Sequence, residues 1–518
     1  MVIIEKLKIQ NFKKFQELTL VFDKESNTII GDNESGKSSI LLALDLVLSG
    51  NKSKIENTGI EFLLNKDCIL NFFTTNRHYK KLPELFIEVY LNEQNNEELN
   101  GRNNSEHKEC DGLKLIISPD DNYTNEIIDI LKSDDKNFPF EFYKCDFKTF
   151  LGKQYSGYKR FTNHIFVDNS RIGSEYAMKE YINGMYNSYI EGADKFEYQN
   201  KYRKYKSNFN SNVLIKINEK TENYYFGVKN DSKSNLLTDL TIFEDDIAIE
   251  NKGKGKQCFI KTEFAIGKSK KTIDIVLIEE PENHLSHSKM QMLLSLISKV
   301  SDRQLFIATH NNLICSRLDL RKAILLNSNS EKPVKFENLD TNTAKYFMKA
   351  PDHNILEFVL AKKVILVEGD AEYMLMGKMF KTVTQMKETE SDITIIAIDG
   401  ISFKRYLDIA KLLTIKTAVI RDNDKDYQNN CVDNYQGYIC DTIKVFSDKN
   451  NIRHTFEISI YLDNKAICDK LFSAKLKTLT VQDYMLKNKT EAAFALLDNK
   501  DELNVPDYIK EAIEWIRQ

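Results

Sequence analysis

The feature that most constrains the fold of this chain is a glycine-rich segment near its N-terminus, residues 31–38. Its sequence, Gly31-Asp32-Asn33-Glu34-Ser35-Gly36-Lys37-Ser38, matches the phosphate-binding pattern G-x-x-x-x-G-K-[ST] in full. A short apolar strand, Asn27 to Ile30, precedes it, and a helical run, Ile40 to Leu48, follows it. Strand, loop and helix stand where a P-loop needs them, so they predict an α/β fold that binds a nucleotide.

In a P-loop the two glycines let several backbone N–H groups converge on one anion, and the helix adds the partial positive charge of its N-terminus. We expect Lys37 to reach the β- and γ-phosphates of ATP and Ser38 to ligate Mg²⁺. The residues expected to contact the nucleotide are Gly31, Asn33, Ser35, Gly36, Lys37, Ser38 and Ser39.

The length and composition indicate a multidomain protein that is mostly ordered. With 518 residues the chain is too long for one core, and two to four domains are expected. Only 7 prolines and 19 glycines argue against long linkers. The net charge of −4 conceals basic clusters, so it does not exclude nucleic acid as a partner. These clusters contain Lys201, Arg203, Lys204 and Lys206; Lys252, Lys254 and Lys256; and Lys268, Lys270 and Lys271.

The cysteines and the apolar segments bear on where the protein works. The 8 cysteines include no C-x-x-C pair and no histidine spacing suited to zinc, which favours reduced thiols. No apolar run approaches the roughly 18 residues of a membrane span. Glu5, Lys6 and Lys8 interrupt the N-terminal apolar stretch, so a signal peptide is not expected. We therefore expect a cytoplasmic protein without a membrane partner.

The residues around the P-loop predict a β-rich platform. Val2 to Ile9 and Leu18 to Phe22 alternate apolar and polar residues, with Asn11 to Phe15 as a turn between them. Glu84 to Leu91 has the composition of another strand, and Asn95 to Asp111 is polar and loop-like. This lead-in to a P-loop resembles the nucleotide-binding lobe of the ABC-type ATPases of the SMC and recombination-repair group. We identify no clear Q-loop glutamine in this region.

Residues 174–206 are rich in Tyr, Lys, Glu and Asn and are expected to form a helical insertion. Basic residues interleaved with tyrosines can bind phosphates and stack bases. Tyrosines spaced along a helix can also form a packing face, including a subunit interface, and we favour packing while both interpretations stay open. The tyrosines concerned are Tyr176, Tyr181, Tyr186, Tyr189, Tyr198, Tyr202 and Tyr205.

The segment Asn251 to Gln257 places Gly253 and Gly255 among lysines, ahead of an apolar helical run. In the ABC-type ATPases the signature sequence occupies this place, and its glycines close over the γ-phosphate bound by the opposite lobe. The resemblance implies a nucleotide contact by Gly253 and Gly255, although the segment departs from the usual Ser-Gly-Gly.

A nearly continuous apolar run, Ile273 to Ile278, ends in Glu279 and Glu280, as a buried central strand of a parallel sheet does. Open α/β sheets bind ligands at the carboxyl ends of their strands, so we expect Glu279 to support Mg²⁺ and Glu280 to polarise the attacking water. The ABC-type family usually has Asp at the first position. The next strand, Leu305 to Thr309, ends in His310, which matches the switch histidine of that family.

A second α/β pattern follows the polar stretches 327–333 and 351–354. Its apolar strands end in carboxylates at Glu368-Gly369, at Asp399-Gly400 and at Asp422-Asn423-Asp424. Carboxylates at the ends of neighbouring parallel strands converge on one edge of a sheet, and several oxygen ligands together suit Mg²⁺ or Mn²⁺. The pattern therefore predicts a metal site.

Glu-Gly on one strand and Asp-x-Asp two strands later resemble the TOPRIM fold of topoisomerases, primases and certain nucleases. An ABC-type ATPase ahead of a TOPRIM domain is the arrangement of the OLD (overcoming lysogenisation defect) nuclease family. That family includes the nuclease subunit of the Gabija anti-phage system and retron-associated effectors. The chain is similar to it over nearly its whole length, with the motifs in the same order.

The resemblance implies a site that hydrolyses phosphodiesters with one or two metals. It implies that Glu457 helps to bind a second metal and that Lys489 stabilises transition-state charge, although a lysine at such a place is by default a helix-surface residue. The implied metal ligands are Glu368, Glu372, Asp422 and Asp424, with Asp426 either a further ligand or a solvated loop acid.

The predicted divisions are an N-terminal ATPase part with the P-loop (1–170), a helical insertion for dimerisation (171–235), a C-terminal ATPase part (236–348) and a TOPRIM nuclease domain (349–518). The function implied is that of an ATP-binding, metal-dependent DNA endonuclease or nickase, an anti-phage effector whose ATPase lobes gate the TOPRIM site. Composite ATPases hold nucleotide between two lobes, so at least a homodimer is expected.

The partners and the role of ATP are more open. No helicase motif occurs in the sequence, so a separate helicase, or a retron reverse transcriptase with its noncoding RNA and DNA, is a candidate partner. The alternative function is that of an SMC-like DNA clamp or sensor ATPase whose TOPRIM domain only binds DNA or a partner. A third hypothesis makes the nucleotide purely structural, and the sequence does not give the direction in which ATP acts on cutting.

Overall fold

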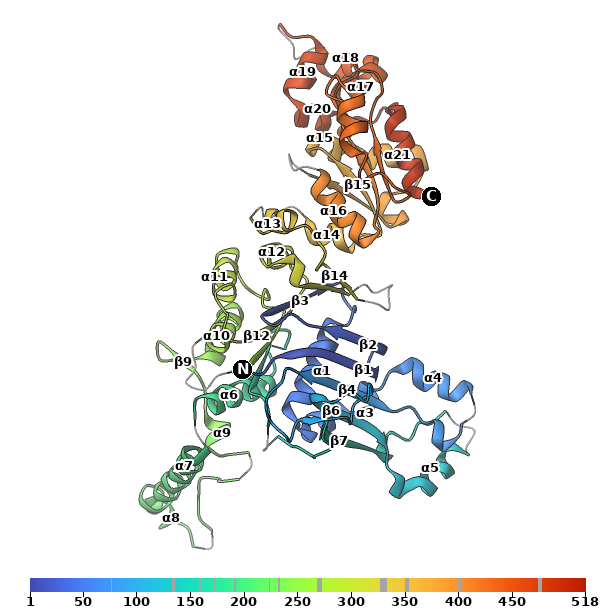
Figure 1. The fold of residues 1–518 in the computed structure, drawn as a ribbon. Helices are drawn as coiled ribbons and strands as arrows, with labels where there is room; N and C mark the ends of the chain where they lie inside the picture. Colours follow the sequence, from blue (N-terminus) through green and yellow to red (C-terminus); the bar gives the residue numbers. More distant parts are fainter. Residues whose placement is uncertain are drawn as a thin grey trace. The chain divides into compact units, whose positions relative to one another are not determined.

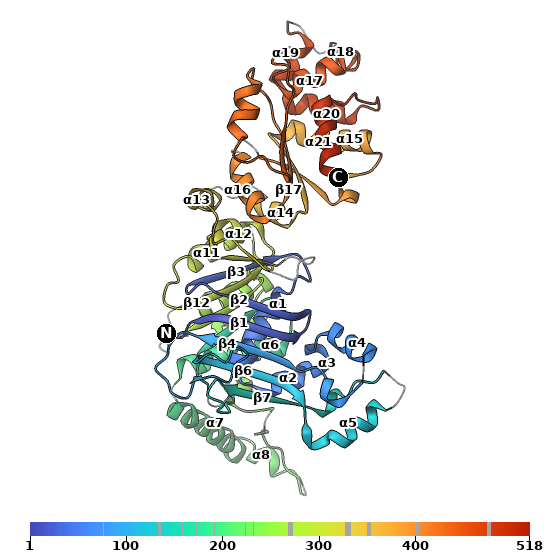
Figure 2. The same ribbon diagram turned by 45° about the vertical axis from the view of Figure 1, so that its right-hand side comes forward.

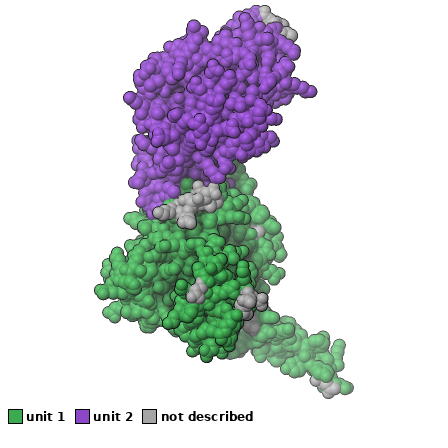
Figure 3. All heavy atoms as spheres, turned by 90° about the vertical axis from the view of Figure 1, so that its right-hand side faces the viewer, with its two compact units in different colours: residues 1–310, 324–333 green, residues 311–323, 334–518 purple. Residues whose placement is uncertain are grey.

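The computed structural model describes residues 1–75, 77–132, 136–157, 160–171, 173–190, 192–222, 224–231, 233–267, 273–326, 333–349, 354–398, 403–473 and 478–518. The chain forms two compact units, coloured separately in Figure 3. Unit 1 comprises Met1–His310 and Ile324–Pro333, and unit 2 comprises Asn311–Ala323 and Val334–Gln518. The predicted division into four segments stays a prediction. The predicted Lys268-to-Lys271 cluster and the Asp399-Gly400 strand end lie outside the described residues.

Unit 1 opens with an antiparallel sheet, in which β2, β1, β4, β6 and β7 lie side by side (Figure 2). Apolar residues alternate along these strands and give the sheet one buried face. The predicted turn over Asn11 to Phe15 is shorter in the structure, because Phe12 and Phe15 still pair across the two strands. The strands are β1 (Ile4–Phe12), β2 (Phe15–Val21), β4 (Leu85–Leu91), β5 (Asn100–Gly101), β6 (Cys110–Pro119) and β7 (Tyr143–Thr149).

A second sheet carries the nucleotide motifs. Its strands follow the order β13, β3, β12, β11 and β8, and the last four are mutually parallel, so their carboxyl ends meet at one edge. The strands are β3 (Ser26–Gly31), β8 (His164–Asp168), β11 (Ile275–Glu279), β12 (Gln304–Thr309) and β13 (Ala323–Leu326).

The helix after the P-loop, α1 (Lys37–Ser49), contacts strands of both sheets of unit 1. It is therefore apolar almost all round, and Ile40, Leu41 and Leu44 are among its fully buried side chains. On the parallel sheet, α10 (Lys254–Ile266) contacts β8 and β11, which buries β11 throughout. The other helices of this part are α2 (Lys52–Thr58), α3 (Ile60–Leu63), α4 (Lys66–Thr74), α5 (Thr124–Leu131) and α11 (His287–Ile297).

The insertion is helical, as predicted, and its two long helices differ. Helix α6 (Glu175–Tyr189) buries Met178, Tyr181, Ile182 and Met185, whereas Lys206 is the one buried side chain among the described residues of α7 (Gly192–Asn212). The tyrosine packing face is thus confined to α6. The remaining elements are α8 (Ile215–Asn218), α9 (Leu236–Asp239), β9 (Phe243–Glu244) and β10 (Ile247–Ala248).

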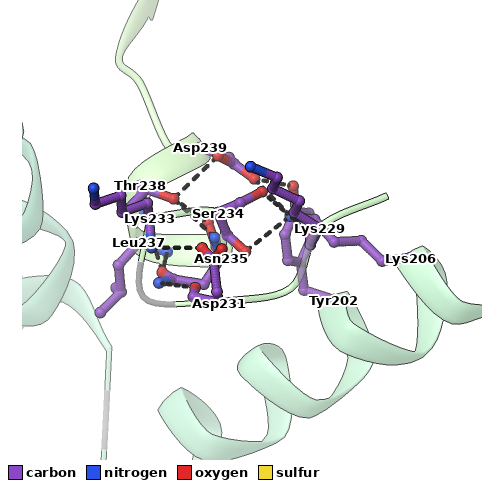
Figure 4. Close-up of polar contacts among 10 residues, drawn as sticks. All are labelled: Tyr202, Lys206, Lys229, Asp231, Lys233, Ser234, Asn235, Leu237, Thr238 and Asp239. Atoms are coloured by element: carbon purple, nitrogen blue, oxygen red, sulfur yellow. Dashed lines mark hydrogen bonds and ion pairs between the residues drawn. The ribbon is translucent and has the colours of Figure 1, made fainter. Parts of the chain in front are cut away.

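Lys206 fixes the return of the chain onto α7 (Figure 4). Its Nζ donates hydrogen bonds to the Ser234 hydroxyl at 2.8 Å and to the Lys229 carbonyl at 3.2 Å. The same ammonium lies 3.1 Å from the Asp239 carboxylate. A buried ammonium needs such partners, so this lysine has a structural role.

Unit 2 is built on a parallel sheet in the order β16, β15, β17 and β18. Figure 1 shows α15, α16 and α21 around β15 of this sheet. Helix α15 packs against α20 and α21, α16 contacts β17 and β18, and α14 contacts α16 and β16. The strands are β15 (Lys363–Val367), β16 (Ile393–Ala397), β17 (Lys416–Ile420) and β18 (Ile443–Phe446), in addition to the short β14 (Val334–Lys335).

The described part of unit 2 contains ten α-helices. None of the helices in the described part of the chain is long and apolar enough to cross a membrane. In chain order the helices are α12 (Asn312–Arg317), α13 (Thr341–Lys349), α14 (Ile355–Leu360), α15 (Asp370–Thr384), α16 (Phe403–Leu413), α17 (Phe456–Asp463), α18 (Lys465–Phe472), α19 (Val481–Lys487), α20 (Lys489–Asp498) and α21 (Asp507–Arg517).

Candidate nucleotide and metal sites

The P-loop has the geometry of a phosphate cradle. A Cβ on Gly31 would lie 2.3 Å from the Leu326 carbonyl oxygen, and one on Gly36 would lie 2.4 Å from the Phe15 ring. Gly36 also has φ 103°, where a side chain is strained. The Lys37 ammonium donates to the carbonyls of Gly31 and Asp32, both at 2.7 Å, and so lies over the loop. Both glycines are therefore required by the backbone path, as the motif predicts.

A cavity of about 310 Å³ lies beside this loop. It is lined by cations from the β1–β2 turn and by hydroxyl groups at the start of α1, a chemistry that suits an anionic ligand. Lys14 fixes the turn to the loop, because its Nζ donates to the Glu34 carbonyl at 3.0 Å. The lining residues are Lys13, Lys14, Asn33, Glu34, Gly36, Lys37, Ser38, Ser39 and Glu280.

Glu279 ends β11 at the edge of this site. Burial, together with the carboxylates of Asp168 and Glu280, raises its pKa to about 7 despite a hydrogen bond from Ser38. Asp168 ends β8 and pairs in register with Glu279. Sequence reasoning missed Asp168. Its signal was a short strand, His-Ile-Phe-Val-Asp, that also ends in a carboxylate.

Glu280 and His310 face one another at the same edge. The His310 Nδ1 lies 3.5 Å from Glu280 Oε1 and 3.6 Å from Glu282 Oε1. Buried Glu282 accepts hydrogen bonds from the Thr309 hydroxyl at 2.6 Å and from the His310 backbone N–H at 3.1 Å. Sequence reasoning gave Glu282 no role, whereas the structure shows that it holds the strand end that carries His310.

The predicted signature glycines occupy different settings. A Cβ on Gly255 would lie 2.1 Å from the His284 carbonyl oxygen, so Gly255 lets α10 approach the segment after β11. Gly253 precedes the first residue of α10 and has no atom within 4 Å of its Cβ position. The lysines beside them are engaged, because Lys252 and Lys256 each lie 2.7 Å from Glu244. Gly255 therefore has a packing role within the chain, and Gly253 is the more open of the two.

A buried lysine connects α10 to the acidic edge. Lys261 is 2% exposed, and its Nζ donates to the Asp168 carbonyl at 2.9 Å. The Tyr181 hydroxyl of α6 donates in turn to the Lys261 carbonyl at 2.6 Å. Burial lowers the pKa of Lys261. Lys261 thus links α10 to the end of β8 by its ammonium and to α6 by its carbonyl, a role that the sequence did not reveal.

In unit 2 the predicted carboxylates converge. Glu368 follows β15, Glu372 lies in the first turn of α15, and Asp422 follows β17. One carboxylate oxygen from each lies within 4.8 Å of the other two. The parallel pairing of β15 and β17 brings these side chains to one edge of the sheet. The structure therefore places three of the predicted ligands together.

The crowding of these acids dominates the electrostatics. Burial raises the pKa of Asp422 to about 9 and that of Glu372 to about 7, and the neighbouring carboxylates add to both effects. Burial also raises the pKa of Glu368, and Arg421 opposes this shift. Removal of water and like charge both disfavour the ionised forms, and the positive charges of Arg421 and Lys489 offset these effects only in part.

Glu457 and Lys489 belong to the same site. Buried Glu457, in the first turn of α17, raises the pKa values of Glu372 and Asp422, and half-exposed Lys489 lowers them. The Lys489 Nζ lies 3.0 Å from Glu457 Oε1. Glu457 Oε2 is buried without a hydrogen-bond partner among the described residues. The two residues that the family resemblance indicated, rather than any local pattern, are thus at the carboxylate cluster.

Asp424 and Asp426 are not in the group of three acids, although the carboxylate of Asp424 is near enough to raise the pKa of Glu368. Asp424 has φ 49° and an exposed side chain 3.5 Å from Arg421. Asp426 accepts a hydrogen bond from the Asn429 N–H at 3.1 Å in an exposed turn. Between them, buried Asn423 donates to the Asp448 carbonyl at 2.8 Å and fixes the loop, a role that the sequence did not reveal.

The cluster fits a hard divalent cation. Several carboxylate oxygens are the ligands that Mg²⁺ and Mn²⁺ prefer, and a cation would favour the ionised forms that crowding disfavours. The unpartnered Glu457 Oε2 is a further oxygen available to such an ion. The donors present therefore match the predicted metal, with Glu368, Glu372 and Asp422 as its nearest set.

Comparison with protein-family models supports both halves of the fold. A model described as an AAA domain matches residues 6–229. A model described as the TOPRIM domain of overcoming lysogenization defect protein-like proteins matches residues 359–424, which include Glu368 and Asp422. The predicted class, an α/β chain with an ATPase domain followed by a TOPRIM domain, is confirmed.

Individual relatives cover parts of the chain. The Old nuclease of Escherichia phage P2 is 24% identical over 167 residues, which are 30% of this chain and 28% of that nuclease. The chain therefore aligns with less than a third of the nuclease's length.

Two solved structures are similar to parts of the chain. The SMC head bound to the C-terminal winged-helix domain of ScpA shares 15% identity, covers 65% of this chain and 99% of its own, and has a TM-score of 0.35. The C-terminal region of the Xanthomonas campestris pv. campestris OLD protein shares 23% identity, covers 31% and 94%, and has a TM-score of 0.25.

Proposed function

Because this chain is an OLD-family protein, in which an ATPase domain precedes a TOPRIM domain, we propose that it is an ATP-binding, metal-dependent DNA endonuclease or nickase. Its TOPRIM site would cut the phosphodiester, and its ATPase domain would regulate the cut. That the substrate is DNA is part of this proposal.

One observation carries this proposal. Oxygens of Glu368, Glu372 and Asp422 gather within 4.8 Å, with Glu457 and Lys489 beside them. A domain that only binds DNA has no need of several buried carboxylates that repel one another and the phosphate backbone. Such a cluster is useful where it binds a divalent cation that assists the attack of water on a phosphodiester.

The residues of the TOPRIM site take distinct roles in the proposal. Glu368, Glu372 and Asp422 would hold a divalent cation, and Asp424 and Glu457 would extend the ligand set. The bound cation would orient a water and neutralise charge on the scissile phosphate. Half-exposed Lys489 would donate to a phosphate oxygen as its charge grows in the transition state. Asp426, which is exposed in a turn, would be either a further metal ligand or a solvated loop acid.

In the ATP site, Lys37 and the P-loop N–H groups would hold the phosphates while Ser38 and Glu279 support Mg²⁺. Glu280 would polarise the attacking water, and His310 would contact the γ-phosphate. The support is the common edge of β11 and β12, where His310 lies 3.5 Å from Glu280. Whether ATP promotes or restrains cutting is an outcome of the assays below.

We also propose a homodimer or higher homo-oligomer. Composite ATPases need a second lobe to close over the nucleotide. Gly253 has no atom within 4 Å of its Cβ position, so it would be free to contact the nucleotide of a second lobe. Light scattering on the Glu280→Gln variant with ATP would show a dimer, and a monomer at all concentrations would contradict this part of the proposal.

The biological role proposed is that of an anti-phage effector. A helicase, or a retron reverse transcriptase with its noncoding RNA and DNA, is the partner proposed. Efficiency of plating measures this role: cells that express the wild-type chain with its neighbouring genes should plate phage less well than cells with Asp422→Ala. Equal plating of both would contradict a defensive role of the TOPRIM site.

The biochemical test is nicking of supercoiled plasmid with Mg²⁺ or Mn²⁺, with and without ATP. We expect Glu368→Ala and Asp422→Ala to abolish nicking while ATP binding is retained. Asp441→Ala is the matched control, because Asp441 is an exposed acid of the same unit outside the cluster. Nicking by both cluster variants would refute the assignment, and DNA binding by the wild type without any cutting would favour an SMC-like clamp.

A further inference from the structure

The antiparallel sheet of unit 1 carries a hollow of about 720 Å³ on its outer face, which no role above uses. Alternation along the strands turns Phe86 of β4 and Lys114 of β6 away from the buried face that packs on α1. The short helix Tyr79–Lys81 and the loop 101–109 form its walls. The polar lining residues that matter are Lys80, Lys81, Arg102, Asn103, His107 and Lys114.

The wall of this hollow is fixed by one buried carboxylate. Glu88 is 0% exposed, although it points to the outer face. It accepts hydrogen bonds from the Ser105 N–H at 2.8 Å and from the Ser105 hydroxyl at 2.7 Å. The Lys114 Nζ lies 2.8 Å from the same carboxylate. The loop is therefore anchored onto the sheet, and the hollow is formed before any ligand binds.

The charge of the lining opposes that of the whole chain. The lining carries four cations, Lys80, Lys81, Arg102 and Lys114, and one carboxylate, Glu84, whereas the chain as a whole carries −4. Lys114 is already paired with buried Glu88, so the surplus positive charge of the hollow comes from Lys80, Lys81 and Arg102. Arg102 pairs with Glu109 at 2.8 Å, but both side chains are more than half exposed, so solvent screens this pair. An anion that enters the hollow can therefore replace Glu109 as the partner of the Arg102 guanidinium.

The chemistry of the lining selects the kind of anion. Lysine, arginine and side-chain amides together bind phosphate oxygens in nucleic-acid complexes. Two lining residues carry aromatic rings, Phe86 and His107, and the Lys114 ammonium lies over one face of Phe86 at 4.9 Å from its centroid. The cations and amides of the hollow therefore fit a phosphodiester backbone, whose phosphates are the same whatever the base sequence.

We propose that this hollow binds the phosphodiester backbone of DNA, independently of sequence, and holds the substrate of the TOPRIM site. The inference rests on the proposed nuclease function, which requires a DNA substrate. It adds a contact on the ATPase domain that lies outside both the nucleotide cavity and the carboxylate cluster.

The test uses the full chain with Asp422→Asn, so that DNA is bound but not cut, and a short fluorescent duplex whose anisotropy is followed as KCl rises. Adding Lys80→Ala and Lys81→Ala should weaken binding about tenfold and flatten the slope of log K against log salt by roughly 1 to 2, since each phosphate contact contributes about 0.9. Both lysines are exposed, so their removal leaves the core intact.

The matched control is Lys24→Ala with Lys299→Ala, which removes the same charge from exposed sites of unit 1 outside the hollow. This control should bind DNA as the parent does. The inference is overturned if both double variants bind equally well. It is also overturned if inorganic phosphate competes as well as DNA does at equal phosphate concentration, because the hollow would then be a free-anion site.

Failure of the inference and failure of the proposed function give different results. If the chain with native Asp422 cuts DNA, and the Lys80 and Lys81 changes alter neither binding nor its salt slope, only the hollow is refuted. If binding depends on these lysines but native chain never cuts DNA with Mg²⁺ or Mn²⁺, the nuclease function is refuted and the hollow stands.

Discussion

The carboxyl ends of β11 in unit 1 and of β15 and β17 in unit 2 carry the two groups of acids, and the groups differ in what surrounds them. Glu279 lies beside Ser38 at the end of a P-loop whose Lys37 supplies a cation. Asp422 instead shares its space with other carboxylates. The pKa of Glu279 rises to about 7 and that of Asp422 to about 9.

This difference reflects the charge that each proposed ligand carries. A nucleotide carries its own negative charge, so the ATP site combines its acids with cations and backbone N–H groups. A site for a divalent cation supplies concentrated negative charge and leaves the positive charge to the ion. In the proposed function, the same strand-end geometry would therefore serve two ligands of opposite charge within one chain.

The largest effect within the ATP site should come from Glu280→Gln. The change removes the carboxylate that would polarise water while it keeps the shape of the side chain, so ATP turnover should fall about 10³-fold. ATP binding should be retained, because Lys37 and the P-loop are untouched. Steady-state phosphate release and equilibrium nucleotide binding measure the two quantities. If wild type already shows no turnover, the nucleotide is structural.

At the opposite site, Lys489→Ala should slow DNA cutting about 10²- to 10³-fold, the range seen when one transition-state donor is removed. Lys489→Arg should restore part of the rate, since it keeps a cation beside Glu457. Lys487→Ala is the matched control, an exposed lysine at the end of the preceding helix. Equal single-turnover rates for the Lys489 and Lys487 variants would make Lys489 an ordinary surface residue.

A smaller effect is expected for Lys261, a positioning residue of the ATP site. Lys261→Met leaves the Asp168 carbonyl without its donor at 2.9 Å, so the end of β8 should loosen. We expect kcat for ATP to fall about tenfold with little change in KM, as for a misplaced group outside direct contact. Lys256→Met, on the same helix and half exposed, is the control. An unchanged kcat, or a change in KM without a change in kcat, would contradict this role.

The smallest effect concerns stability without metal. Folded Asp422 holds its proton up to a pKa of about 9, whereas the unfolded side chain loses it near 3.8. The folded state therefore binds more protons between these values, and stability falls as pH rises through that window. Asp422→Asn cannot ionise, so in EDTA at pH 8 its Tm should exceed that of wild type by about 2 to 4 °C.

At pH 5 in EDTA the advantage of Asp422→Asn should shrink, because the unfolded wild-type chain gains free energy by ionising Asp422 in proportion to the pH above 3.8, and that gain is small at pH 5. With saturating Mg²⁺ the order should reverse, because the cation stabilises only the chain that binds it. Thermal melts at the two pH values, with EDTA and with Mg²⁺, check the sign. A wild-type chain more stable than Asp422→Asn in EDTA at pH 8 would contradict the crowding of charge.

The parts of each site that sequence predicts are those with short-range patterns. The P-loop spans eight residues, and the apolar runs before Glu279, Glu368 and Asp422 mark buried strands whose ends must meet in a parallel sheet. Helix and strand types followed from the same patterns. The sequence alone therefore predicts that these carboxylates lie at the edges of the sheets.

The parts that sequence could not supply depend on contacts across long chain separations. Asp168 becomes part of the ATP site only through the pairing of β8 with β11, and Lys261 matters only because its ammonium reaches the Asp168 carbonyl. Glu457 and Lys489 have no local pattern, and only the resemblance indicated them. The hollow on the outer sheet depends on how one loop folds over buried Glu88, which no periodicity reveals.

The central claim is that the two acid-bearing strand ends do separate jobs, one for ATP and one for DNA. The most direct test measures ATP binding and Mg²⁺-dependent plasmid nicking side by side in Lys37→Ala and Asp422→Ala. We predict that Lys37→Ala loses ATP binding but retains a cutting site active in at least one nucleotide condition, and that Asp422→Ala binds ATP but never nicks. Nicking by Asp422→Ala at the wild-type rate would contradict the account.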